Sequence, residues 1–168
     1  MTTPRFHIPH EMSVIEIVHP GGPEVLVPTT RPVPRAGADE VLIRVDAAGV
    51  NGPDVLQRKG LYKPPPGASD IPGLEVSGGI VEVGSDVRRF KAGDRVCALL
   101  TGGGYAEYAV ANQAVTMHVP AGLDMIEAAA MPETFMTVWL NLVQRGNYRP
   151  ASPYSSMEAR PALARPQP

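Results

Sequence analysis

The sequence predicts a mainly β fold: a small, partly open β-barrel with short helices at its rim and a helix pair at its C-terminal end. Two observations support this prediction. The 168 residues include 17 glycines and 19 prolines, which divide the chain into short segments typical of strands joined by turns. After Pro120 the apolar residues change from alternation to helical spacing.

Composition narrows the possible functions. Charged residues make up 19% of the chain and the formal net charge is −2, whereas proteins that bind nucleic acid or anionic membranes usually present a basic face. No apolar run approaches the roughly 20 residues that cross a bilayer. We therefore expect neither a nucleic acid nor a membrane partner. The single cysteine, Cys97, excludes a disulfide within the chain and favours a reducing, cytoplasmic compartment.

The first half of the chain is expected to be mostly strand. The strongest signal covers residues 40–50, where Val41, Ile43 and Val45 alternate with Leu42, Arg44 and Asp46. Both faces are apolar at one end, which we expect to be buried more deeply. Shorter strands are expected over 12–19 and 24–27. Residues 28–34 begin and end with proline, and we expect an irregular connector there.

Further strands follow a Pro-rich loop. Residues 74–83 predict a long strand, in which Gly78 and Gly79 mark a bulge or a close approach of two backbones. Turns are expected on either side of the next apolar segment. The remaining predicted strands cover residues 95–100, 105–111 and 114–119.

Three short helices complete the prediction. One covers residues 52–59 and ends at Gly60. The C-terminal pair covers 124–131, with Asp124 as its N-cap, and 134–144, with apolar side chains at helical spacing.

The two ends of the chain lack both periods. We expect residues 1–11 to be a disordered leader and residues 150–168 a disordered Pro-rich tail. Such segments cannot bury enough apolar surface to offset the entropy of ordering them. The folded domain is accordingly predicted over residues 12–149.

Several segments, in order along the chain, resemble the zinc-independent quinone oxidoreductases of the medium-chain dehydrogenase/reductase superfamily, which are similar to ζ-crystallin. The segments are P-G-G-P-E-V-L (20–26), G-V-N-G-P-D-V-L-Q-R-K-G-L-Y-K-P-P-P (49–66), G-L-E-V-S-G-G-I-V-E-V-G (73–84), K-A-G-D-R-V (91–96), G-G-Y-A-E-Y (103–108) and A-A-A-M-P-E-T-F-M-T-V-W (128–139). A single one of these motifs would be weak, whereas their common order is specific.

The resemblance implies a GroES-like alcohol dehydrogenase N-terminal domain, which in the family precedes a Rossmann domain that binds NADPH. The sequence has no G-x-G-x-x-G motif. The glycines at 102–104 lie between two predicted strands and open no helix, so they do not form a phosphate-binding turn. We therefore expect a chain truncated before the Rossmann domain, with weak or no NADPH binding of its own.

The resemblance also bears on metal binding. In zinc-dependent relatives a cysteine and a histidine hold the catalytic zinc at the positions of Asn51 and Leu74, and neither residue is a good zinc ligand. We expect no metal site. The histidines are scattered along the chain, at His7, His10, His19 and His118.

Three candidate site residues follow from the resemblance. Asn51 matches the family's asparagine at the nicotinamide–substrate cleft, as a catalytic and a cofactor contact. Tyr62 could pack against or hydrogen-bond a planar substrate, and Thr137 matches a threonine that approaches the nicotinamide. Each has a structural alternative: a turn residue, an anchor of the Pro-rich loop, and a threonine bonded to its own helix. Asp54 is expected as a helix cap, and Glu75 as a structural hydrogen-bond acceptor.

Without a metal, a quinone suits hydride transfer from NADPH, because the resulting hydroquinone anion is stabilised by its aromatic ring. The resemblance thus implies an NADPH-dependent quinone oxidoreductase, of which this chain carries the substrate side. One alternative is a non-catalytic truncated isoform, an interaction module that self-associates or pairs with a full-length homologue. Another is a binding module in the manner of the co-chaperonin barrel.

Overall fold

The computed structural model describes residues 6–148. The contacts within the chain divide it into two compact units, one ending at Thr134 and the other beginning at Phe135. The expected tail at 150–168 and the first five residues of the expected leader lie outside the described residues. Of the leader, residues 6–10 have no helix or strand, and Glu11 already belongs to the first strand.

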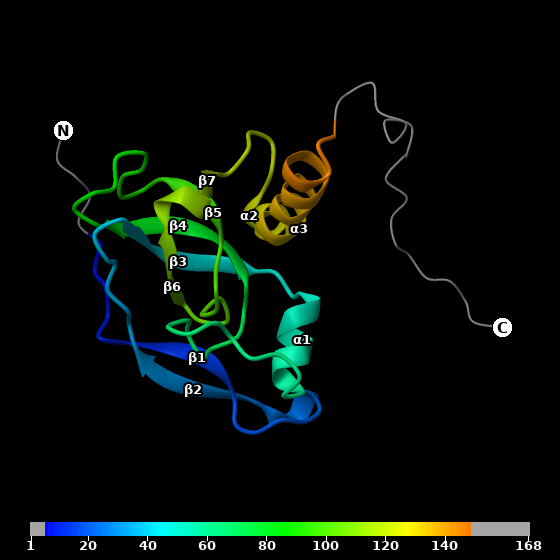
Figure 1. Ribbon diagram of the computed structural model, residues 1–168. Helices are drawn as coiled ribbons and strands as arrows, with labels where there is room; N and C mark the ends of the chain where they lie inside the picture. Colours follow the sequence, from blue (N-terminus) through cyan, green and yellow to red (C-terminus); the bar gives the residue numbers. More distant parts are fainter. Residues whose placement is uncertain (1–5, 149–168) are drawn as a thin grey trace. The chain divides into compact units, whose positions relative to one another are not determined.

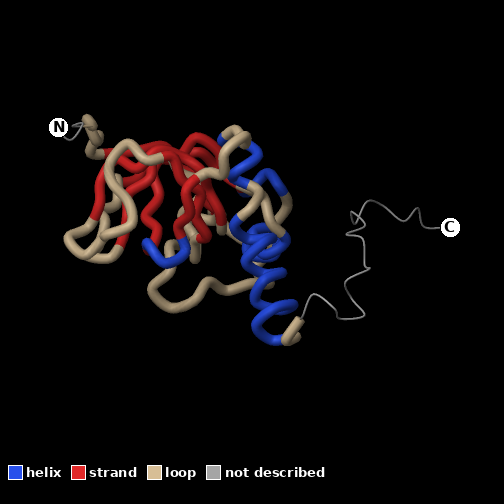
Figure 2. The backbone as a smooth tube through the Cα atoms, turned by 90° about the horizontal axis from the view of Figure 1, so that it is seen from above, coloured by secondary structure: helices blue, strands red, loops and turns tan. Residues whose placement is uncertain are grey.

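A five-stranded antiparallel sheet forms the body of the first unit (Figure 1). In this sheet β3 (Glu40–Ala48) lies between β6 (Tyr108–Asn112) and β4 (Glu75–Val83), and β5 (Arg95–Leu99) and β7 (Thr116–His118) follow beyond β4. The sheet curls into a half-barrel, which confirms the predicted mainly β, partly open fold. Figure 2 shows the strands gathered side by side with loops at their ends.

The core of this sheet is built from the alternating apolar residues that predicted the strands. Val41 and Ile43 of β3 are fully buried against Val76 and Ile80 of β4. Burying a side chain of this size stabilises the fold by roughly 1.5–3 kcal/mol. The predicted close approach at Gly78 is also present, because a Cβ there would overlap the carbonyl oxygen of Arg44.

A separate two-stranded sheet pairs β1 (Glu11–Ile17) with β2 (Leu26–Pro32) in antiparallel register. The expected strand over 24–27 and the irregular connector over 28–34 are therefore wrong. Residues Pro23–Val25 form a 3₁₀ turn, and the strand begins after them.

The prolines of β2 explain this error. Proline cannot donate to a strand ladder, so it argues against a central strand. β2 has only β1 as a hydrogen-bonded neighbour, and an edge strand accommodates Pro28 and Pro32 because its outward N–H positions need no partner.

The expected strand over 105–111 is shorter in the structure, because its first three residues pair with β1 instead. The Ile15 N–H donates to the Tyr105 carbonyl at 2.8 Å, and the Glu107 N–H donates to the Ser13 carbonyl at 3.1 Å. These contacts carry the chain from one sheet to the other. The expected strand over 114–119 is also shorter, since Gln113–Val115 form a 3₁₀ turn before β7 (Thr116–His118).

Two short helices of the first unit agree with the prediction. The helix α1 (Gly52–Arg58) is followed by Gly60 at φ +73°, a left-handed conformation that glycine adopts without a steric penalty. The helix α2 (Met125–Ala129) begins after Asp124, whose carboxylate accepts the Glu127 N–H at 2.8 Å.

The last helical segment has two parts. The helix α3 (Pro132–Val138) begins in the first unit and continues into the second, where Trp139–Arg145 form a π-helix. The Gly146 N–H donates to the Asn141 carbonyl at 2.8 Å, which is the wider i to i−5 pattern. The expected single α-helix over 134–144 is thus wrong in type. The spacing of apolar residues does not distinguish an α-helical turn from a π-helical turn. Among residues 6–148, no helix is both long and apolar enough to span a membrane.

Candidate active site around Asn51

Asn51 lies where β3 has ended and α1 begins, and its backbone is extended at φ −118°. Asp54, three residues later, is only 4% exposed. The Asn51 N–H donates to Asp54 Oδ2 at 2.8 Å, so this carboxylate caps the helix start as expected.

Asp54 also collects donors from two distant segments. Its Oδ1 accepts the Gly73 N–H at 3.1 Å, and its Oδ2 accepts the Tyr105 hydroxyl at 3.2 Å. A buried carboxylate is costly unless hydrogen bonds compensate for the water it has lost. Three donors from three segments therefore hold this side chain in one place.

A second buried carboxylate holds the side chain of Asn51. Glu75, at the start of β4, is 2% exposed, and its Oε1 accepts from Asn51 Nδ2 at 2.8 Å. Its Oε2 accepts the Glu133 N–H at 2.8 Å. Gly49 makes room for this arrangement, since a Cβ there would overlap the Glu75 carboxylate. Asp54 thus fixes the backbone of Asn51, and Glu75 fixes its amide.

Tyr105 belongs to this network, although the sequence did not single it out. Burial, followed by the nearby charge of Asp54 and the hydrogen bond to it, raises the pKa of the Tyr105 phenol. The sequence marks this contact only through its partner, Gly73. Gly73 has φ +104°, and a Cβ there would lie 2.7 Å from Cδ1 of the Tyr105 ring, so glycine is needed at this position.

The other two candidates are not part of these hydrogen bonds. Tyr62 is half-buried in the loop after α1, and within the described residues it makes no hydrogen bond to Asn51. Thr137 lies on the part of α3 that belongs to the second unit and is exposed. The structure thus joins Asn51 to Asp54 and Glu75, and it leaves the roles of Tyr62 and Thr137 as predictions.

Exposed apolar side chains flank Asn51 in the sequence and at the end of α1. Val50 is 76% exposed and Leu61 is 73% exposed. The Leu61 N–H donates to the Leu56 carbonyl at 2.8 Å, which holds the loop against the end of the helix. One exposed apolar side chain is thus next in the sequence to the oriented amide of Asn51, and the other lies beyond the opposite end of α1.

The donors expected of a metal site are not gathered at this position. Asn51 directs its amide N–H to Glu75, and Leu74 is a buried apolar side chain. Within the part of the chain that the structure describes, no group of three His, Cys, Asp or Glu residues could hold a metal ion.

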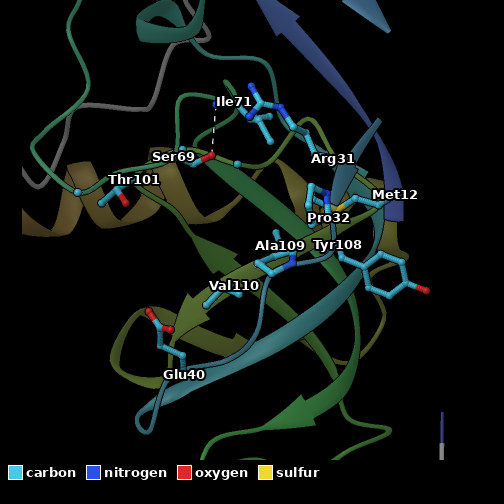
Figure 3. Close-up of a pocket in the computed structure, with 14 residues that line it drawn as sticks. Met12, Arg31, Pro32, Glu40, Ser69, Ile71, Thr101, Tyr108, Ala109 and Val110 are labelled. Carbon is cyan, nitrogen blue, oxygen red and sulfur yellow. Dashed lines mark hydrogen bonds between the residues drawn. The ribbon is translucent and has the colours of Figure 1, made fainter. Parts of the chain in front are cut away.

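A separate hollow of about 420 Å³ opens elsewhere in the first unit (Figure 3). Met12 and Ile71 form part of its apolar lining, and Arg31 at its edge is ion-paired with Glu16 and Asp70. Neither of the two candidates in this unit lines it. The hollow is therefore distinct from the network around Asn51.

The fold and the asparagine held by a buried carboxylate can be compared with known protein families. The model of the alcohol dehydrogenase GroES-like domain matches residues 37–121, half of the chain. The chain therefore belongs to the family of alcohol dehydrogenase GroES-like domains.

More particularly, its relatives include quinone oxidoreductases of the medium-chain dehydrogenase/reductase superfamily. It is 39% identical over 134 residues to the chloroplastic quinone-oxidoreductase homolog of Spinacia oleracea (77% of this chain, 41% of the relative). It is 40% identical over 134 residues to the quinone oxidoreductase of Lama guanicoe (79% of this chain, 41% of the relative). The chain thus spans about two fifths of the length of these relatives.

The structural comparison agrees with this family. A mycobacterial protein solved in complex with NADPH superposes with a TM-score of 0.71 at 32% identity, over 82% of this chain and 43% of that one.

Proposed function

We propose that this chain supplies the quinone-facing wall of an NADPH-dependent, zinc-independent quinone oxidoreductase, with Asn51 as the polar contact for the substrate and the nicotinamide. The observation that carries the proposal is the Asn51 amide, which Glu75 holds at 2.8 Å and which is next in the sequence to the exposed side chain of Val50. The names of the relatives support the substrate class.

The chemistry of a quinone fits this surface. A quinone is a flat apolar ring with carbonyl acceptors. One N–H of the Asn51 amide is committed to Glu75, and the other has no partner among residues 6–148, so it can donate to a carbonyl oxygen. Because the amide is already oriented, little is lost in ordering it when the substrate binds. The exposed side chain of Val50, which precedes Asn51 in the sequence, would contact the ring.

The glycine turn at 102–104 does not fit the phosphates of NADPH. A phosphate cradle needs free backbone N–H groups at a helix start. The N–H groups of Gly103, Gly104 and Tyr105 instead donate to the carbonyls of Ile71, Gly73 and Pro72 at 2.7, 3.0 and 2.9 Å. When bound, NADPH supplies the hydride. The role proposed for this chain is limited to orienting rings through Asn51 and Tyr62. The expected contact of Thr137 with the nicotinamide stays a prediction from the resemblance.

A binding titration followed by NMR tests the proposal. The ¹⁵N-labelled chain is titrated with anthraquinone-2-sulfonate and, separately, with reduced nicotinamide mononucleotide. We expect changes at the Asn51 side-chain amide and near Tyr62, with affinities in the millimolar range, because only a few hydrogen bonds oppose the cost of association. Asn51→Ala should abolish them.

Asn112→Ala is the matched control. Its amide donates to the Asp39 carboxylate, as that of Asn51 does to Glu75, but it lies at the other end of β3, where Asn112 pairs with Glu40. Ligand-induced changes confined to the hollow of Figure 3, or no change at Asn51 near saturation, would contradict the proposal.

The non-catalytic alternative has one observation in its favour. In the second unit, Phe135, Val138 and Trp139 are exposed apolar side chains at helical spacing. We propose that this face promotes self-association or pairing with a full-length homologue. Sedimentation of the chain at several concentrations tests this, and a monomer at all of them argues against it. The cytoplasmic location stays a prediction, since the spinach relative is named as chloroplastic.

A further inference from the structure

We propose that Tyr105 is a positioning residue that sets the orientation of Asn51 through the carboxylate of Asp54. The effect on quinone binding rests on the proposed function of Asn51. The coupling of Tyr105 to Asn51 follows from hydrogen bonds to Asp54 alone. Through Asp54, the segment that connects the two sheets is joined to the candidate site.

The coupling follows from a shared acceptor atom. Asp54 Oδ2 accepts both the Asn51 N–H, at 2.8 Å, and the Tyr105 hydroxyl, at 3.2 Å. The Gly73 N–H holds the other oxygen at 3.1 Å, which limits rotation of the carboxylate. Removing the Tyr105 hydroxyl therefore changes the hydrogen bonding of Oδ2, the atom that anchors the backbone of Asn51.

Asp54 depends on these neutral donors. The ion pairs of the described residues join Arg31 to Glu16 and Asp70, and Lys91 to Asp94, and none includes Asp54. At 4% exposure, Asp54 gains little from water. The loss of one of three hydrogen bonds is consequently a large change for this carboxylate.

Tyr105 is anchored well enough to act as a fixed point. Its carbonyl accepts the Ile15 N–H at 2.8 Å and its N–H donates to the Pro72 carbonyl at 2.9 Å. Its ring lies against Gly73, where a side chain would displace it. The phenol also stays protonated at neutral pH, so the hydroxyl remains a donor to Asp54.

The test compares Tyr105→Phe with Tyr108→Phe in the ¹⁵N-labelled chain. Tyr108 is also half-buried, lies three residues further on, and its hydroxyl makes no hydrogen bond within residues 6–148. Three quantities are measured for each variant: the backbone and side-chain amide signals of Asn51, the dissociation constant for anthraquinone-2-sulfonate, and the free energy of unfolding in urea.

We expect Tyr105→Phe to shift both Asn51 signals and to weaken quinone binding by about two- to tenfold, the range that corresponds to one ordinary hydrogen bond. Tyr108→Phe should change neither quantity. A purely structural role would lower only the free energy of unfolding. Asp54→Asn, which keeps the side-chain shape but removes the charge, should move the Asn51 signals in the same way.

The outcomes separate the two proposals. If Tyr105→Phe folds and leaves the Asn51 signals unchanged, the positioning role is wrong. If the signals shift but the wild-type chain shows no quinone binding, the coupling stands and the proposed function fails. Should Tyr105→Phe not fold, 3-fluorotyrosine at position 105 keeps the hydroxyl and alters its donor strength. Unchanged Asn51 signals would then overturn the inference.

Discussion

Tyr105 and Asp54 are separated by 51 positions in the sequence, yet the hydroxyl of one donates to the carboxylate of the other at 3.2 Å. The same carboxylate holds the N–H of Asn51. This contact connects the segment that crosses between the two sheets with the start of α1, and it links the protonation of one phenol to the stability of the fold.

The pKa of Tyr105 is raised, first by burial and then by Asp54. Its ordinary value is about 10, so the stabilisation linked to its protonated form is fully present below about pH 10 and is lost as the pH rises toward the folded-state pKa. We expect urea-unfolding free energies of the wild type to fall above pH 10 more steeply than those of Tyr105→Phe. Difference absorbance at 295 nm between the two proteins follows this phenol directly. Ionisation of Tyr105 at or below pH 10 would contradict the prediction.

Gly73→Ala should destabilise the fold by about 2–5 kcal/mol. Gly73 has φ +104°, where an L residue is strained by about 1–2 kcal/mol. Its new methyl group would also overlap the Cα of Gly104 and both the backbone N and the ring of Tyr105, at a typical cost of about 1–3 kcal/mol.

Gly67→Ala is the control for the backbone term. Gly67 has φ +84° and nothing within 4 Å of an added Cβ, so only the strain should remain. Chemical denaturation of both variants checks the difference between them. Equal losses would show that the contact between residue 73 and Tyr105 is not tight.

The purified chain is predicted to contain no stoichiometric zinc. The Asn51 amide is turned toward Glu75 and Leu74 is apolar, so neither position offers a thiolate or an imidazole. Elemental analysis should find far less than one zinc per chain, and a chelator should leave the melting temperature unchanged. One tightly held zinc per chain would overturn both this prediction and the zinc-independent chemistry.

The 168-residue chain alone should show no saturable, NADPH-dependent quinone reduction. The backbone N–H groups of Gly103 and Gly104 are already bonded to Ile71 and Gly73, so the phosphates find no cradle there. Hydride transfer needs the reacting atoms held within about 3–3.5 Å. NADPH bound without phosphate contacts is held too weakly to keep its nicotinamide at that distance. Absorbance at 340 nm with a simple quinone measures the rate. Saturable turnover by the pure chain would require phosphate contacts from residues outside 6–148 or from a second chain.

Local pattern was a good guide where one physical demand dominated. The alternation over residues 40–50 predicted β3 because Val41 and Ile43 lie in the core on one face of that strand, while Arg44 on the other face is exposed. The helix over 52–59 followed from its proline start and glycine end. The prediction failed for β2, where two prolines suggested irregular chain, because local sequence does not show that a strand lies at an edge. It also failed over 134–144, where the same apolar spacing suits an α or a π turn.

By itself the sequence determined the class of fold and the identity of Asn51 as a candidate, since these depend on short-range periodicity and on ordered motifs. It also indicated that Asp54, three residues after Asn51, would cap the short helix over 52–59. Only the tertiary structure placed Glu75 against the Asn51 amide and Tyr105 against Asp54, across 24 and 51 positions. The physical reason is that a buried carboxylate needs hydrogen-bond donors, and the folded chain brings those donors from distant segments. Glycines at 49 and 73 leave the space for that approach. Such partners are selected by packing in three dimensions, which no local pattern records.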